Sequence, residues 1–92
     1  MIVEDFDNQC AERAVSQDEL PPDPEGRNED RSQTALDALR TLVTSTGADT
    51  EDALSDLLCN LMHFADRYDF DFESELGRAE MHYRAETSRK RA

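Results

Sequence analysis

Apolar residues recur with helical spacing through the second two-thirds of the chain. The clearest pattern covers about 50–68, where they return every three or four positions, as on the core-facing side of a helix. A similar pattern ends before Gly47, and another runs from Phe72 to Tyr83. No sustained alternation of apolar and polar residues, the mark of a strand, occurs. We therefore predict an all-α fold over 32–88, a small three-helix domain built as a helical hairpin plus one helix.

Residue types that favour helix ends separate these patterns. Gly47 suits the left-handed position after a helix, and Asp49 or Thr50 can cap the next one. Asp71 can cap the third helix, with Phe70 before it as a hydrophobic staple.

The first 31 residues have a different character. They hold ten acidic residues and three arginines, and all three prolines of the chain lie among them. High charge with few bulky apolar residues is typical of disorder. We predict an acidic, largely flexible arm over 1–31, in which 4–15 can form a short helix with Phe6, Cys10 and Ala14 on one face. A basic tail is expected over 89–92.

Composition restricts the classes of function. The 92 residues include 22 acidic and 10 basic side chains, giving a net charge of −12, and only 37% are apolar. Such charge argues against direct binding to nucleic acid or anionic membranes, because phosphate contacts need a basic surface. Neither a membrane span nor a signal peptide is evident, so we expect a cytoplasmic protein with Cys10 and Cys59 reduced. Its small core would gain from a second copy, and we expect a homodimer.

The acidic residues are unevenly placed. If the second and third helices are antiparallel, the basic C-terminus lies near Asp49, Glu51 and Asp52, and the turn between those helices keeps an uncompensated negative charge. Acidic residues also cap helices and maintain solubility. The residues expected to bind a partner are Asp66, Asp69, Asp71, Glu73 and Glu75, with Asp52 and Asp56 secondary.

Catalytic and metal-binding patterns are weak. Cys59 and His63, one helical turn apart, with Asp56 nearby, do not complete a metal site. A cation site at Asp66, Asp69 and Glu73 would straddle a helix end, as any loose acidic turn does. The sequence has no phosphate-binding loop and no nucleophile–base motif. We predict no catalytic residue, no metal and no cofactor.

Part of the chain resembles a group of small proteins. The run 51–67 (EDALSDLLCNLMHFADR), followed by Asp71-Phe72-Glu73 and His82-Tyr83, is similar to uncharacterised proteins of bacterial plasmids, integrative elements and phages. This resemblance implies a mobile-element origin. By size and charge the chain also resembles inhibitors of host defence, the anti-restriction and anti-CRISPR proteins, some of which are DNA mimics.

The same run resembles the all-α MazG-type nucleoside triphosphate pyrophosphohydrolases, in which paired acidic residues hold Mg²⁺. Those enzymes need a second carboxylate one turn after the first. Here Asp52 is followed at that spacing by Ser55, and Asp56 by Cys59. No catalytic residue is carried over from this resemblance.

These observations favour a non-enzymatic interaction protein. We expect it to bind and block a basic, nucleic-acid-binding surface of a host defence or regulatory complex. One alternative is a degenerate MazG-like, Mg²⁺-dependent pyrophosphohydrolase. Another is an antitoxin-like accessory subunit with an apolar interface, for which Phe6, Phe70 and Phe72 are the exposed aromatic candidates.

Overall fold

The fold is that of a computed structural model, which describes residues 1–89 of the chain. Within that range every regular element is helical, so the predicted all-α class is confirmed. Four α-helices are present, the three predicted for 32–88 and one over Val3–Glu12, where a short helix within 4–15 was expected, with one 3₁₀ turn. In chain order the elements are α1 (Val3–Glu12), η1 (Gln17–Glu19), α2 (Asn28–Thr46), α3 (Thr50–Arg67) and α4 (Phe72–Thr87). None of the helices is long and apolar enough to cross a membrane.

Two helix ends predicted from the sequence are confirmed. After α2 the chain turns at Gly47, whose φ is 72° and whose N–H donates to the Val43 carbonyl over 2.9 Å. Glycine adopts this left-handed conformation at little cost. Before α4, the Asp71 carboxylate accepts a hydrogen bond of 3.1 Å from the Ser74 N–H. Asp49 stands at the N-cap of α3, although its side chain makes no capping hydrogen bond.

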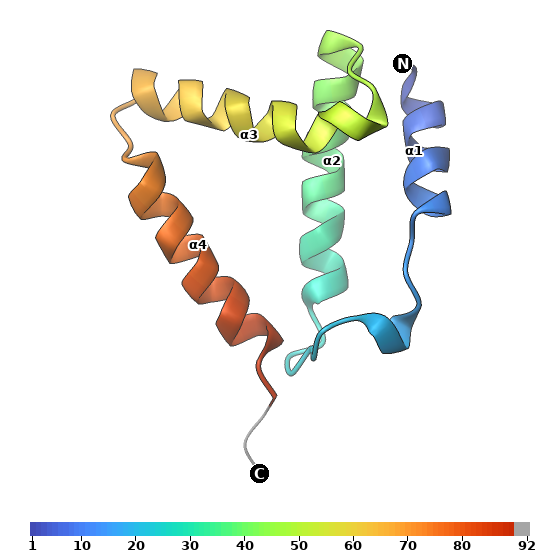
Figure 1. Ribbon diagram of the computed structural model, residues 1–92, viewed down its shortest axis with the longest axis vertical. Helices are drawn as coiled ribbons and strands as arrows, with labels where there is room; N and C mark the ends of the chain where they lie inside the picture. Colours follow the sequence, from blue (N-terminus) through green and yellow to red (C-terminus); the bar gives the residue numbers. More distant parts are fainter. Residues whose placement is uncertain (90–92) are drawn as a thin grey trace.

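The N-terminal helix is part of the core, which corrects the prediction of a loose arm. α1 lies antiparallel beside α2 (Figure 1). Phe6 is only 2% exposed and clusters with Leu42, Val43 and Ala53 from α2 and α3. This burial also removes Phe6 from the predicted exposed aromatic residues. An acidic helix thus packs on the domain mainly through one buried side chain, Phe6, together with the partly buried Met1 and Cys10.

Polar contacts reinforce the position of α1. The Arg40 guanidinium on α2 donates to the Asp7 carboxylate over 2.8 Å and to Asp37 over 2.9 Å. The hydrogen bond to Asp7 is the main reason that the pKa of Arg40 lies above its ordinary value. At the N-terminal end of α1, the amino group of Met1 donates to the Gly47 carbonyl over 3.0 Å. The middle and the N-terminal end of α1 therefore contact the rest of the chain.

The N-terminus of α2 is capped by a side chain from the preceding segment. Both carboxylate oxygens of Asp23 accept backbone hydrogen bonds, from the N–H groups of Arg27 (3.1 Å) and Asn28 (3.3 Å). Because the first N–H groups of a helix lack intrahelical partners, Asp23 satisfies two of them. The helix thus begins at Asn28, and the predicted boundary between arm and domain, near residue 31, falls inside α2.

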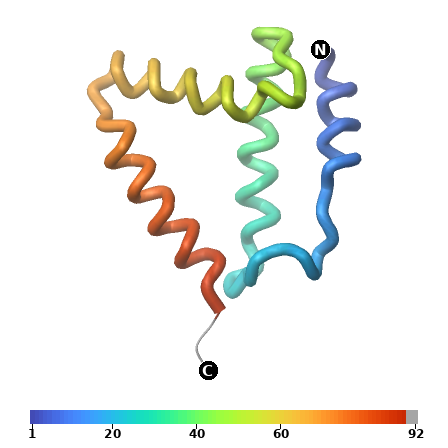
Figure 2. Tube along the Cα trace, in the orientation of Figure 1, coloured from blue at the N-terminus to red at the C-terminus, as the bar shows by residue number. Residues whose placement is uncertain are grey.

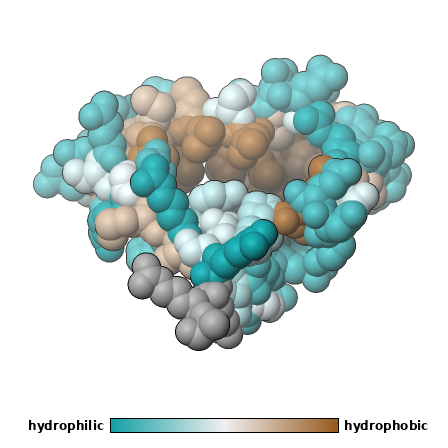
Figure 3. All heavy atoms as spheres, turned by 60° about the horizontal axis from the view of Figure 1, so that its bottom comes forward, coloured by the Kyte–Doolittle hydropathy of each residue, from teal (hydrophilic) through white to brown (hydrophobic). Residues whose placement is uncertain are grey.

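The three longer helices form the sides of an open triangle. α1 lies against the side of α2 that faces away from α4, and α3 and α4 diverge from a shared corner (Figures 1 and 2). They do not pack along their length as the predicted helical hairpin. Seen from the bottom edge of the triangle, apolar side chains gather over α3 at the back of a hollow (Figure 3).

The end of α4 contacts the start of α2. The side-chain amide of Asn28 donates to the Glu86 carbonyl over 2.9 Å, and Arg31 pairs with the Glu86 carboxylate at 3.4 Å. For the described part of the C-terminus, the prediction that it lies beside the acidic residues at the start of α3 is therefore wrong. Of the predicted basic tail, only Arg89 lies within the described residues.

Candidate functional site: the acidic corner

The corner between α3 and α4 is a tight, hydrogen-bonded turn. The Tyr68 N–H donates to the Phe64 carbonyl over 3.0 Å, and the Phe70 N–H donates to the Ala65 carbonyl over 2.9 Å. Between them Asp69 has a φ of 60°, a left-handed conformation that aspartate tolerates better than most residues. The side chains of this turn are thus carried on a defined backbone between two helix ends.

Five exposed carboxylates lie on this corner. Asp71 caps α4, and Glu75 contacts Arg78 weakly at 3.4 Å. Arg67, the one basic residue within the turn, donates to the His63 backbone carbonyl over 3.4 Å and forms no ion pair within the described residues. The negative charge of the corner is therefore largely uncompensated. We call the following five residues the acidic corner: Asp66, Asp69, Asp71, Glu73 and Glu75.

The two secondary candidates lie elsewhere. Asp52 and Asp56 are exposed on the first half of α3. At 1.5 Å per residue, Asp56 stands about 15 Å along the helix axis from Asp66, and Asp52 about 21 Å. The structure therefore assembles the first five predicted residues at one corner and separates the other two from them.

Exposed aromatic rings accompany these carboxylates. The Phe64 ring stacks on Phe70, with centroids 5.8 Å apart, and lies against Tyr68 at 4.7 Å. All three side chains are about half exposed or more, with Tyr68 at 66%. The sequence prediction included Phe70 and missed Phe64, although the spacing of Phe64 and Tyr68 places them on one helix face. Phe72, the remaining aromatic candidate, is half-buried.

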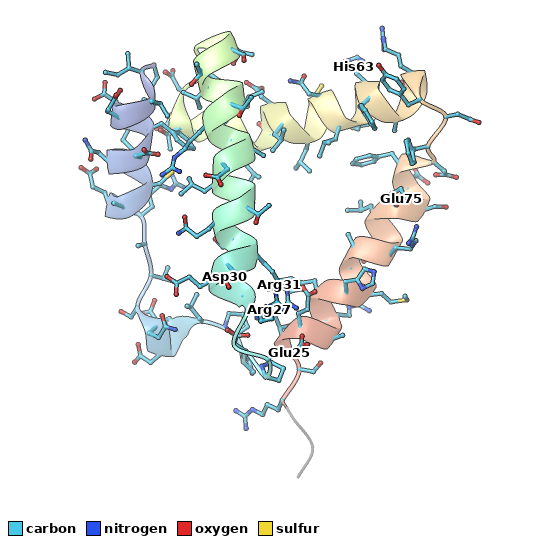
Figure 4. The ribbon with its side chains drawn as sticks, turned by 180° about the vertical axis from the view of Figure 1, so that it is seen from behind. Glu25, Arg27, Asp30, Arg31, His63 and Glu75 are labelled. Carbon is cyan, nitrogen blue, oxygen red and sulfur yellow. The ribbon has the colours of Figure 1, made fainter. Side chains whose placement is uncertain are left out.

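The described part of the chain offers no metal-binding arrangement. No three or more His, Cys, Asp or Glu residues in 1–89 lie close enough together to share an ion. Cys59 and His63 are both exposed on α3. Figure 4 shows His63 and Glu75 on different helices on either side of the corner.

A groove of about 630 Å³ lies at the opposite end of the triangle from the corner. It is bounded by the segment before α2, the start of α2 and the end of α4. Its main polar side chains, Asn28 and Arg31, already contact each other over 2.7 Å and contact Glu86. Arg31 also pairs with Glu25 at 3.1 Å, and both are visible where α2 begins (Figure 4). These contacts join the end of α4 to the start of α2.

Comparisons with protein-family models, curated proteins and solved structures found no significant match. The function of the chain must therefore be argued from its own surface, where the corner combines charge with aromatic area.

Proposed function

We propose that the protein is a non-enzymatic interaction protein whose acidic corner binds a basic, nucleic-acid-binding surface of a protein partner. The observation that carries the proposal is the combination of uncompensated carboxylates and exposed aromatic rings on one turn. Carboxylates alone would serve solubility equally well. Stacked, half-exposed rings do not aid solubility, whereas aromatic residues are enriched in protein interfaces.

This combination matches arginine-rich surfaces in particular. A guanidinium group forms paired hydrogen bonds with a carboxylate and also stacks on an aromatic face. Arginines that bind DNA or RNA phosphates are available to both contacts. A partner of this kind would bind the carboxylates of this protein in place of nucleic-acid phosphates. Its electrostatic attraction to a chain of net charge −12 would also speed association.

We propose that the partner is a host defence or regulatory complex. The protein would block it in the way that anti-restriction or anti-CRISPR proteins block their targets. The chain would then act as a DNA mimic in the limited sense that its carboxylates occupy phosphate positions. The small size of the chain and its net charge of −12 support this choice of partner.

The test is capture of partners from a bacterial lysate that contains defence systems, with a corner variant beside the wild type. The variant carries Asp66→Lys, Asp69→Asn and Glu73→Lys. Asparagine at 69 preserves tolerance of the left-handed backbone, and Asp71 is kept because it caps α4. We expect the wild type to capture a basic nucleic-acid-binding protein that salt and duplex DNA release, and the variant to lose it.

A control variant with the same change in charge separates the corner from net charge. It carries Glu12→Lys, Asp18→Asn and Glu19→Lys, all at exposed positions on α1 and η1. We expect it to bind nearly as well as the wild type. Equal loss in both variants would show that overall charge, rather than the corner, attracts the partner.

The aromatic part of the proposal has its own test. Tyr68→Ala removes an exposed ring without changing charge. We expect it to weaken partner binding while leaving the dependence of affinity on salt unchanged. Unaltered affinity would remove the aromatic rings from the binding site.

An antitoxin-like accessory subunit is the second candidate, because much of α3 and α4 is apolar and exposed. Capture that resists both salt and DNA would favour it. Pyrophosphate release from a nucleotide panel with Mg²⁺ would instead favour the MazG-like enzyme.

A further inference from the structure

The inner faces of α3 and α4 form a second apolar surface, away from the acidic corner. On α3 the leucines Leu54, Leu58 and Leu61 are 62%, 45% and 44% exposed. Figure 3 shows apolar side chains over this helix at the back of the hollow. On α4, Leu76 and Tyr83 are also exposed. Leucines rarely remain so exposed in such a continuous set unless another surface covers them.

The spacing of these residues is the spacing of paired helices. From Leu54 the exposed apolar positions on α3 follow at intervals of 4 and 3 through Leu61, and the apolar positions on α4 follow at intervals of 3 and 4 from Leu76 through Tyr83. An average interval of 3.5 keeps one seam facing a neighbouring helix along its length. The neighbour is missing within the chain, because α3 and α4 diverge (Figure 1).

Helix α4 has little support of its own. None of its residues is buried. It contacts the rest of the chain at the corner and through Glu86, which meets Asn28 and Arg31. Most of the stability of a helix in a protein comes from packing of its apolar face, and an isolated helix of this length is marginal in water. The face of α4 therefore needs a surface to pack against.

The size of the missing contact can be estimated. The accessible surface of the chain is 7598 Å² and its mass 10.5 kDa. A compact monomer of that mass exposes about 5,400 Å², so about 2,200 Å² is in excess. The radius of gyration is 15.2 Å, against about 12 Å for a compact chain of this length. A stable homodimer buries about 1,000 Å² or more on each copy, so the excess is sufficient for one.

We propose that a second copy of this chain covers the inner faces of α3 and α4 and forms a symmetric homodimer. The area suits this occupant, because the excess exposed surface is at least what each copy of a stable homodimer buries. The dimer does not depend on the proposed function, since its centre is the leucine face.

The first test measures the mass of the protein in solution by sedimentation at about 5 and 100 μM. We expect a species of twice 10.5 kDa at the higher concentration. A single species of 10.5 kDa at both concentrations would overturn the proposal, as would assembly into a series of larger species.

Variants assign the dimer to this face. Leu58→Gln with Leu61→Gln should weaken dimerisation ~100-fold or more, since the pair of substitutions replaces four leucines of the apolar interface in each dimer with polar side chains. Ile2→Gln, a similarly exposed apolar residue outside α3 and α4, should leave it unchanged. Equal dimerisation in both variants would contradict the assignment.

A measurement on the wild type covers the case in which the leucine variant does not fold. Amide hydrogen exchange along α4 should slow as protein concentration rises, because dimerisation supplies the packing that α4 lacks. Exchange that is independent of concentration would overturn the proposal.

Discussion

Replacing Phe6 by alanine tests the seating of α1 on the domain. Phe6 is one of the two largest fully buried side chains, and its neighbours Leu42, Val43 and Ala53 belong to α2 and α3. Truncating a buried phenylalanine lowers the free energy of unfolding by about 3–5 kcal/mol. Domains are stable by about 5–15 kcal/mol in total. Phe6→Ala should therefore remove a large share of the stability of the protein.

The assay is urea unfolding followed by circular dichroism at 222 nm, at one fixed protein concentration because dimerisation contributes to stability. Val15→Ala is the control, since Val15 is exposed and its loss should change the free energy of unfolding by less than about 0.5 kcal/mol. If Phe6→Ala costs less than about 1 kcal/mol, α1 does not pack on α2 as the structure has it.

Five further substitutions test local features, each by thermal or urea unfolding. Asp23→Ala removes the carboxylate that caps α2 and should cost about 1 kcal/mol, whereas Asp18→Ala, which caps nothing, should cost little. Gly47→Ala should destabilise by about 1 kcal/mol because φ is 72°, while Gly77→Ala, in open space within α4, should stabilise by up to about 1 kcal/mol. Ala53→Leu should cost about 1–3 kcal/mol, since Ala53 is buried where α2 and α3 meet; no loss would mean that those helices pack loosely.

The positions of helices that depend only on the residues within one segment could be predicted closely from the sequence. The apolar stripe predicted a helix at about 50–68, and α3 covers Thr50–Arg67. Gly47 and Asp71 marked the ends of two helices correctly, because left-handed backbone and N-capping depend on a single residue and its nearest neighbours. The five residues of the acidic corner could also be grouped from the sequence, since they lie close together along the chain, in the turn between α3 and α4 and in the helix ends beside it.

Features that depend on distant contacts could not be predicted. Phe6 is a single apolar residue in an acidic segment, and only the surface offered by α2 and α3 decides that it is buried. The Asp23 cap joins residues only four and five positions apart, but it depends on the turn of the chain at Gly26, whose φ is 68°, and this turn brings the carboxylate to the start of α2. The divergence of α3 and α4 depends on the turn at Asp69 and on the contact of Glu86 with Arg31, far apart in sequence.

Competition for a purified partner tests the central claim most directly. The partner captured by the wild type is bound to fluorescently labelled duplex nucleic acid, and fluorescence anisotropy follows its displacement as the protein is added. The account predicts displacement by the wild type and by the variant changed at Glu12, Asp18 and Glu19, and none by the variant changed at Asp66, Asp69 and Glu73. Undiminished displacement by the corner variant, or a wild type that binds the partner without displacing nucleic acid, would contradict it.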